Sequence, residues 1–465
     1  MRRYFGDRAF YRRLLAVMIP ILVQNVITNF VGLLDNIMVG RLGTEQMSGV
    51  AIVNQLIFVF ALCIFGGISG AGIFTTQFYG SRDDEGIRHT VRVKLYIALI
   101  AVAVFAAGFI FFGDKLIMQF LHQGEEELDL EATLAYGKDY LSVMLWQLLP
   151  FALMQVYSGT LRETGETVVP MLSGVIAIFV NLFLNWVLIF GKLGAPALGV
   201  RGAALATLIA RFVELGVVAV WAHTHTGRYT YIKGLYSSPH VPKKLLGKIA
   251  VKGTPLLINE LMWSAGMTML NQCYSIRGLE VVSAVNISST VSNLFFCSFF
   301  AMGSTVSIMV GRLLGAGEYE RAVDEDRKLI VFSVLLCSAT GLLMAAVAPL
   351  IPKVYNTTPA VKALAASLLT VSACMMPMDA FTGASYFTMR SGGKTAVTFL
   401  FDSGFSWAVI VPTALLLARG TGLGIVPLYA VCSFTVVIKC LLGGFMVHRR
   451  YWVNTLSGAD RREER

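Results

Sequence analysis

Residues 20–43 have the sequence PILVQNVITNFVGLLDNIMVGRLG. As a helix, the stretch is apolar enough and long enough to cross roughly 30 Å of hydrocarbon. It nevertheless carries Asp35, with no lysine or arginine among the twenty residues before it. An ionised carboxylate in hydrocarbon is energetically costly, so acids in spanning helices face a cavity or the protein interior. Residues 20–43 therefore predict a membrane span whose acid belongs to an internal polar site.

The composition is that of a membrane protein with many spans. Of 465 residues, 56% are hydrophobic and 14% charged, whereas a soluble protein carries about a quarter charged residues. Apolar runs between charged, glycine or proline breaks predict twelve spanning helices and no strands. Their ranges are 14–39, 47–79, 92–113, 133–160, 167–190, 199–223, 250–276, 281–311, 329–351, 362–389, 395–418 and 424–446. We expect an all-α, multi-pass protein of the cell membrane.

The distribution of basic residues predicts the orientation of the spans. With the N-terminus inside, most of the 38 lysines and arginines fall in cytoplasmic segments, as the positive-inside rule requires. An even number of spans then places both termini in the cytoplasm. The net charge of +10 faces the anionic inner leaflet, so it gives no reason to expect nucleic-acid binding.

The second half of the chain repeats the first. An ungapped alignment of the first two helices of each half pairs Pro20 with Pro255, and after a short gap the alignment continues and pairs Arg211 with Lys439. Each repeat holds six spans, so both begin on the same side of the membrane and the repeats are parallel. We therefore expect two six-helix lobes around a central cavity. The predicted boundaries are 1–225 for the N-terminal lobe, 226–248 for a cytoplasmic linker, and 249–465 for the C-terminal lobe with its basic cytoplasmic tail.

Four polar side chains of the N-terminal lobe are expected at similar depth. At 1.5 Å per residue, Asn181 and Thr207 lie about 12–14 Å from the outer ends of their spans, and Asp35 lies about 12 Å from Gly43, where the quoted stretch ends. Asn185 lies one turn from Asn181 on the same helix face. One carboxylate with amide and hydroxyl oxygens can hold a proton or a small hard cation. The pattern predicts a cation-coupling site in this lobe.

Two further acids, Glu260 and Asp379, are expected at matched depth in the C-terminal lobe, about 15–16 Å from the cytoplasmic ends of their spans. Because two bare carboxylates repel each other, they would share a proton or flank a cation. They predict a second cation-coupling site.

Other polar or soft side chains also lie within the spans. Four of them are expected near the cavity: Gln24, Asn25, Met375 and Asp402. Arg211 is three residues from Glu214, so the two charges are expected to neutralise each other. The sequence assigns no further role to Arg211 or to its repeat partner Lys439.

Each candidate residue also has a structural interpretation. Asp35, Glu260 and Asp379 would then be hydrogen-bonded to neighbouring helices, while Asn181 and Asn185 would hold helices together. The cost of burying an acid favours the functional interpretation for the three carboxylates.

Motifs of enzymes and ATP-driven pumps are absent from the sequence. The string SGGKT at 391–395 lacks the glycine that a phosphate-binding loop needs six residues before its lysine, since Thr388 stands there. No HExxH zinc motif occurs, and His223 and His225 lie at the end of a span with no third ligand nearby. We expect no enzymatic activity, no cofactor, and no metal other than a coupling Na⁺.

Several motifs resemble those of the multidrug and toxic compound extrusion (MATE) family. They are DNIMVGRLG at 35–43, LRETGETVVPM at 161–171, NLFLNWVLIFGKLGAPALGVRGAALAT at 181–207 and VSIMVGRLLGAGE at 306–318. The resemblance covers nearly the whole chain. It implies an antiporter that exports amphipathic, often cationic, compounds in exchange for entering Na⁺ or H⁺. We expect small-molecule substrates and a monomeric protein.

The resemblance also reaches individual residues. The family's first-lobe cation site matches Asp35, Asn181 and Thr207, whereas the position of Asn185 is often an aspartate in one bacterial branch. Glu260 and Asp379 match acids of the sodium-coupled bacterial branch.

Two features keep alternatives open. In the sodium-coupled branch a tyrosine precedes the second acid by four residues; this chain has Met375 there, and a thioether is a poor ligand for a hard cation. The alternative function is that of a lipid-linked precursor flippase of the same superfamily. Flippases that move anionic head groups tend to have arginine-rich cavities.

Overall fold

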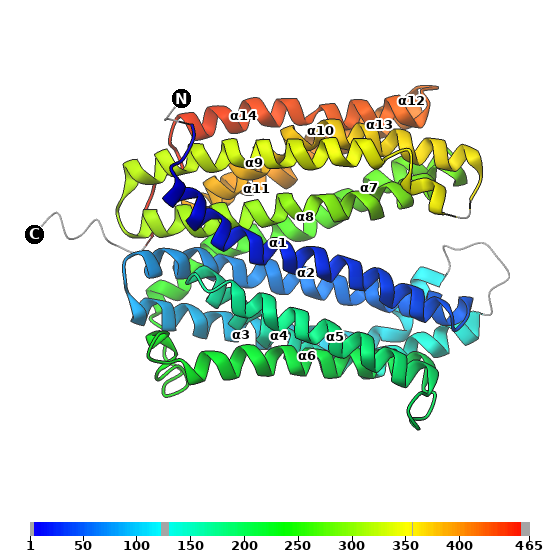
Figure 1. Cartoon of the computed structure of the whole chain (residues 1–465), viewed down its shortest axis with the longest axis horizontal. Coiled ribbons are helices and arrows are strands. Elements are labelled where there is room, and N and C mark those ends of the chain that lie inside the picture. Colours follow the sequence, from blue (N-terminus) through cyan, green and yellow to red (C-terminus); the bar gives the residue numbers. More distant parts are fainter. Residues whose placement is uncertain (1–3, 122–129, 356, 457–465) are drawn as a thin grey trace, which may run out of the picture. The chain divides into compact units, whose positions relative to one another are not determined.

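The computed structural model describes residues 4–121, 130–355 and 357–456 (Figure 1). Within these residues the chain is helical and contains no strand. Residues 457–465, the end of the predicted basic tail, lie outside the described part of the chain. The all-α prediction is confirmed.

The first repeat supplies six long helices. They are α1 Arg8–Gly40, α2 Thr44–Gly80, α3 Asp84–Leu121, α4 Leu130–Glu163, α5 Val168–Phe190 and α6 Gly199–Thr224, followed by the short 3-10 helix η1 Thr230–Ile232. Helices such as α3 begin in polar sequence well before the predicted apolar run, because a helix continues into the aqueous region beyond the bilayer.

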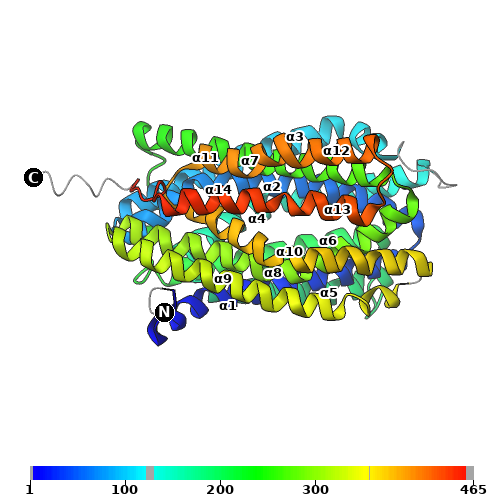
Figure 2. The same ribbon diagram turned by 90° about the horizontal axis from the view of Figure 1, so that it is seen from above.

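The second repeat has the same plan with two interrupted helices. Its elements are α7 Lys243–Ser275, α8 Leu279–Gly315, α9 Tyr319–Val347, η2 Ile351–Val354, α10 Pro359–Ser391, α11 Thr395–Phe399, η3 Leu400–Gly404, η4 Ser406–Ile410, α12 Val411–Gly420, α13 Ile425–Phe434 and α14 Val436–His448. The elements from α11 to α12 form one continuous span, and so do α13 and α14, which lie in line in Figure 2.

Eleven helical segments of the described residues are long and apolar enough to cross a membrane. The remaining predicted span, 250–276, coincides with α7, a helix of 33 residues. Polar residues such as Asn259 and Glu260 make α7 less apolar than the other long helices. The chain is therefore a multi-pass membrane protein, and each of the twelve predicted spans coincides with a helical segment.

The chain folds into two compact units that do not follow the repeat boundary strictly. Unit 1 contains Ala250–Arg465 together with Met1–Leu22 and Thr76–Asp83, and unit 2 contains Val23–Thr75 and Asp84–Ile249. The first turns of α1 thus belong to the unit built mainly by the second repeat. There Phe10, Leu14 and Ile21 pack in one apolar core with residues of α8 and α9.

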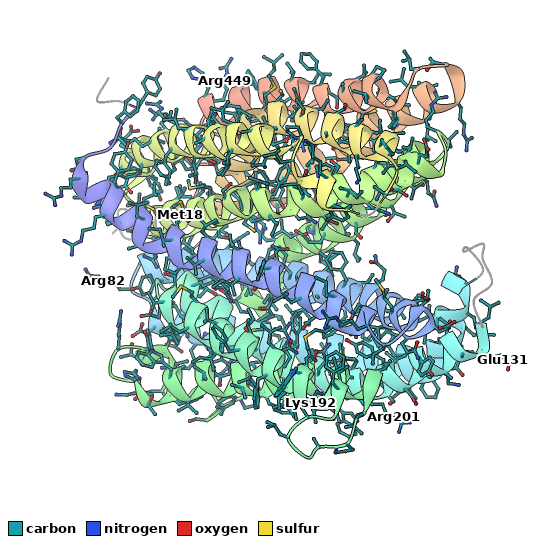
Figure 3. The ribbon with its side chains drawn as sticks, turned by 45° about the vertical axis from the view of Figure 1, so that its right-hand side comes forward. Met18, Arg82, Glu131, Lys192, Arg201 and Arg449 are labelled. Carbon is teal, nitrogen blue, oxygen red and sulfur yellow. The ribbon has the colours of Figure 1, made fainter. Side chains whose placement is uncertain are left out.

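In unit 2, α5 and α6 lie side by side and α6 packs against α4 (Figure 1). The α5 helix ends where Gly191 adopts a left-handed conformation, with φ 65°, which glycine adopts without steric penalty. The turn that follows brings α6 back along α5. Lys192 and Arg201 mark this end of the pair in Figure 3.

The segment between the repeats is docked on unit 2. Arg92 of α3 donates hydrogen bonds to the carbonyl oxygens of Gly234 at 2.8 Å, Leu235 at 2.9 Å and His240 at 3.0 Å. The Tyr229 hydroxyl donates to Glu166 at 3.0 Å, and burial raises the pKa of the Tyr229 phenol above its ordinary value. Residues 229–240 are therefore held by specific contacts, although their polar sequence predicts only a linker.

A close helix crossing in unit 1 joins two repeat-related glycines. A Cβ atom on Gly80 of α2 would overlap the carbonyl oxygen of Arg312, and one on Gly315 of α8 would overlap that of Gln77. The alignment of the two repeats pairs Gly80 with Gly315 and Gln77 with Arg312. The last turns of α2 and α8 therefore approach each other at a point that only glycine permits.

We predict that Gly80→Ala and Gly315→Ala each destabilise the protein. An added methyl group forces the two backbones apart, and overpacking of this kind costs about 1–3 kcal/mol. The midpoint of thermal unfolding in detergent should fall for both variants. Gly108→Ala is the control, because a Cβ there meets nothing within 4 Å. An unchanged midpoint in both crossing variants would contradict the close approach.

Candidate functional site

The four polar residues predicted in the N-terminal lobe lie together in unit 2. Asp35 comes from α1, Asn181 and Asn185 from α5, and Thr207 from α6. The Asn185 side-chain nitrogen donates to Asp35 Oδ1 at 2.6 Å. Asn181 and Thr207 are 3.2 Å apart between amide and hydroxyl. Both asparagines are buried, with exposed fractions of 6% for Asn181 and 2% for Asn185, so their amides need partners inside the protein.

The amide of Asn181 connects the carboxylate to α6. With its nitrogen turned toward Asp35, Asn181 donates to the two carboxylate oxygens at 2.9 and 3.1 Å, and its oxygen accepts from the Thr207 hydroxyl at 3.2 Å. In this orientation the Asn181 nitrogen faces the carboxylate and its oxygen faces the Thr207 hydroxyl, while the nitrogen also lies 3.2 Å from the side-chain nitrogen of Asn185. Asp35 is then held by two neutral amide groups rather than by a positive charge.

One oxygen of this cluster is left without a partner. The buried side-chain oxygen of Asn185 accepts no hydrogen bond from any described residue. Together with the Asp35 carboxylate, the oxygen of Asn181 and the Thr207 hydroxyl, it forms a set of hard oxygen donors. Such a set suits Na⁺, and the carboxylate alone suits a proton.

Charged and aromatic groups surround the cluster. Arg211, one turn beyond Thr207 on α6, forms an ion pair of 2.7 Å with Glu214, as the sequence predicts. Its guanidinium lies 5.3 Å from the ring centroid of Phe151. Arg211 also lies within electrostatic range of Asp35. Sequence reasoning missed Tyr140 of α4, a buried phenol near Asp35.

Gln24 and Asn25, expected near the cavity, are placed apart from the Asp35 cluster. The Gln24 oxygen accepts a hydrogen bond of 2.7 Å from Arg162 of α4. The Gln24 side chain also lies beside Gly174 of α5, where an added Cβ atom would touch it. The backbone carbonyl of Asn25 accepts from the side chain of Asn29 at 3.0 Å. Gln24 therefore belongs to a separate contact with a half-buried arginine.

The two acids of the second repeat are not joined to each other in unit 1. No hydrogen bond or ion pair connects Glu260 of α7 with Asp379 of α10 in the described residues. The charged groups acting on Glu260 are Arg390 and Asp402, whereas Lys439 acts on Asp379. The predicted depths of Glu260 and Asp379 are compatible with these different surroundings, because depth along a helix does not determine which neighbouring residue a side chain faces.

Asp402 is held from two sides. Lys439 of α14 forms an ion pair of 2.9 Å with its Oδ1 atom, and Asn259 of α7 donates to its Oδ2 atom at 3.2 Å. Asp402 lies in the π-helical segment η3, Leu400–Gly404. Single π turns within α-helices are often found at functional sites.

Asn259 connects α7 with the helix that carries Asp402. Its side-chain oxygen accepts from the Ser403 hydroxyl at 2.8 Å and from the Ser403 backbone nitrogen at 3.3 Å. Its nitrogen also donates to the Tyr386 hydroxyl at 3.3 Å. Sequence reasoning missed Asn259, although the alignment of the repeats makes it the partner of Gln24. Met375, the other predicted cavity residue, is half-buried one turn before Asp379 on α10.

Comparison with known proteins gives a consistent picture. The MatE family model matches residues 20–187 and 255–414, one match in each repeat. The chain is 25% identical over 415 residues to a probable multidrug resistance protein NorM of Thermotoga maritima, covering 89% of this chain and 87% of that protein. It is 26% identical over 420 residues to the multidrug resistance protein MdtK of Yersinia enterocolitica, covering 90% and 89%.

Solved structures share the fold. The outward-facing conformation of a multidrug resistance MATE family transporter of the MOP superfamily superposes with a TM-score of 0.83 at 19% identity, covering 96% of this chain and 98% of that one. A MATE in the straight conformation gives a TM-score of 0.83 at 20% identity, with 97% of both chains covered.

We predict that Asn185→Asp makes the protein's stability depend on Na⁺. The new carboxylate would stand beside Asp35, where two negative charges repel unless a cation lies between them. Na⁺ bound only by the folded protein stabilises it, by about 2.7 kcal/mol at a hundred times its dissociation constant. Added NaCl should therefore raise the unfolding midpoint of this variant more than that of the wild type, while choline chloride of equal ionic strength should not.

Asn25→Asp is the matched control for Asn185→Asp, because it adds an acid to α1 outside the cluster. Equal responses of Asn185→Asp, Asn25→Asp and wild type to Na⁺ would contradict a cation site at Asp35.

Proposed function

Since the chain belongs to the MatE family, we propose that it is a secondary active antiporter that exports cationic or amphipathic compounds in exchange for Na⁺ or H⁺. The names of the relatives, multidrug resistance proteins, support multidrug efflux. The observation that carries the proposal is the Asp35 cluster, a carboxylate within a spanning helix held by neutral amides. Because no cation among the described residues is paired with it, an ion from outside can neutralise a charge so placed.

The geometry suggests how Asp35 would couple ion entry to export. While no ion is bound, the amides of Asn181 and Asn185 satisfy the carboxylate by hydrogen bonding. A proton on Asp35, or Na⁺ among the oxygens of the cluster, removes the net charge and changes which atoms the amides face. Because α1, α5 and α6 each contribute to the cluster, neutralisation biases how these helices pack. The exported compound is favoured in the state that is not neutralised, so ion and compound alternate.

The acids of the second repeat are better suited to substrate recognition than to sodium coupling. Met375 replaces the oxygen donor expected beside Asp379, and Asp402 is already paired with Lys439. The three carboxylates Glu260, Asp379 and Asp402 make this region attractive to a cationic compound. We propose that they influence substrate range.

The charge pattern favours this function over that of a lipid-linked precursor flippase. Arg211 and Lys439, the repeat-related cations, are each paired with a carboxylate. A paired cation has little free charge with which to hold an anionic head group. We therefore propose a transporter, not an enzyme, that works as a monomer in the cell membrane with both termini cytoplasmic. The basic residues of the predicted cytoplasmic segments support this orientation.

We predict that overexpression in an efflux-deficient host lowers the accumulation of lipophilic cationic dyes such as ethidium. Collapse of the Na⁺ and H⁺ gradients should restore accumulation, because the gradient supplies the free energy for export. Dye fluorescence in cells gives the measurement, with a neutral dye of similar size as the control. Unchanged accumulation of several cations by a well-expressed protein would favour the flippase.

We predict that Asp35→Asn abolishes coupled efflux at normal expression, because a neutral side chain can no longer exchange ions. Glu260→Gln and Asp379→Asn should retain part of the activity and alter which compounds are exported. The measurement is the efflux rate in liposomes against imposed Na⁺ or H⁺ gradients, at matched protein amounts. Coupling that survives in Asp35→Asn but disappears in Glu260→Gln would move the coupling site to the second repeat.

A further inference from the structure

The ammonium group of Lys439 occupies a site with the chemistry of an organic-cation receptor. Its Nζ atom is 2.9 Å from the Asp402 carboxylate. It also lies 5.2 Å from the ring centroid of Phe401 and 5.9 Å from that of Phe405. A carboxylate and aromatic faces are the groups by which proteins bind alkylammonium and other organic cations.

The walls of this site stay in place without the lysine. Phe401 and Phe405 are buried, with exposed fractions of 4% and 7%. The second oxygen of Asp402 keeps its hydrogen bond from Asn259, which is in turn fixed to Ser403. The ion pair itself is partly accessible, since 13% of the Lys439 side chain and 23% of the Asp402 side chain are exposed. A second cation therefore has access to a preformed receptor.

Lys439 also has a second carboxylate available. It lies within electrostatic range of Asp379, whose carboxylate makes no hydrogen bond or ion pair with any described side chain. The flexible four-carbon side chain of lysine allows its ammonium group to move between neighbouring acids. Displacement from Asp402 would thus exchange one favourable interaction for another and leave no buried charge without a partner.

The repeat-related cation of the other lobe has a different second acid, because Arg211 lies within electrostatic range of Asp35 of α1. Arg211 pairs with Glu214 on its own helix and lies over Phe151. The alignment that pairs Arg211 with Lys439 also pairs Phe151 with Asp379. An apolar ring thus stands where the second repeat has an acid, so displaced Arg211 would find no carboxylate at the position equivalent to Asp379.

We propose that Lys439 is a tethered occupant of an organic-cation site formed by Asp402, Phe401 and Phe405. An exported monovalent cation binds there by displacing the lysine ammonium from Asp402 toward Asp379. The inference rests on the proposed function and specifies its substrate class as monovalent cations with apolar or aromatic substituents. The lysine makes binding weak enough for release, because it competes with every substrate at a high local concentration.

The test is direct binding to the purified full-length protein. The probe is tetraphenylphosphonium, a permanent monovalent cation, compared with neutral triphenylphosphine oxide by equilibrium dialysis. Lys439→Met removes the competitor and should tighten binding of the cation by about tenfold or more, with no change for the neutral compound. Lys439→Arg keeps a competing charge and should remain near the wild type. Asp402→Asn should weaken binding of the cation.

Lys138→Met is the control, because it removes a lysine that pairs with an acid, Asp114 at 2.7 Å, away from the aromatic rings of the proposed site. Equal tightening in Lys138→Met and Lys439→Met would reveal a general charge effect and overturn the proposal. Unchanged or weaker cation binding in Lys439→Met would also overturn it.

If Lys439→Met fails to fold, Lys439→Gln removes the competing charge while keeping a polar side chain beside Asp402. It should also bind the cation more tightly than the wild type, and binding no tighter than that of the wild type would overturn the proposal. If the wild type exports the cation but Lys439→Met binds it with the same affinity as the wild type, the inference about Lys439 is wrong and the proposed function stands. Absence of both efflux and binding in every variant overturns the proposed function as well.

Discussion

Inside a bilayer, every polar group must find its partner within the protein, and this constraint explains how the helices of each unit are joined. Lys94 of α3 is fully buried, and it donates to Thr160 at 3.2 Å and to Glu163, both on α4. Just before the predicted span 329–351, Asp326 of α9 accepts a hydrogen bond from Thr388 of α10 at 2.6 Å, while its second oxygen has no hydrogen-bond partner among the described residues. Thr160 and Thr388 are repeat partners, so equivalent hydroxyls hold opposite charges in the two repeats. Such contacts are costly to break because no water replaces them.

The same constraint distinguishes structural charges from functional ones. Lys94 has a carboxylate beside it, so its charge is compensated permanently by the protein. Asp35 is held by the amides of Asn181 and Asn185, which satisfy its hydrogen-bonding capacity but supply no positive charge. Arg211 acts on Asp35 from a distance but is already paired with Glu214. The carboxylate therefore remains the group of this cluster whose charge a mobile ion can change.

The spans could be predicted from the sequence because the length of an apolar run fixes a helix that must cross hydrocarbon. Likewise, Asp35, Asn181, Asn185 and Thr207 could be predicted to meet, because depth along each helix is fixed by residue number. Direction around the helix axis is set by packing and was not predictable. Depth placed Glu260 and Asp379 at one level, and the prediction that they share a proton or flank a cation stays a prediction; packing adds an ion pair between Asp402 and Lys439. Asp402 lies in the π-helical turn Leu400–Gly404, which the sequence did not predict.

The two repeats have the same order of helices, but different residues at equivalent positions give them different chemistry. Gly80 and Gly315 remain equivalent because their close crossing tolerates no side chain. The polar sites differ: Leu270 stands in the second repeat where the first has Asp35, and Phe151 stands in the first where the second has Asp379. The first repeat thus offers hard oxygens without a resident cation, which suits a coupling ion. The second offers carboxylates beside aromatic rings with a resident lysine, which suits an organic cation that must bind and then leave. Ion and substrate need not share a site for their binding to exclude each other, because each can favour a different packing of the helices that hold it.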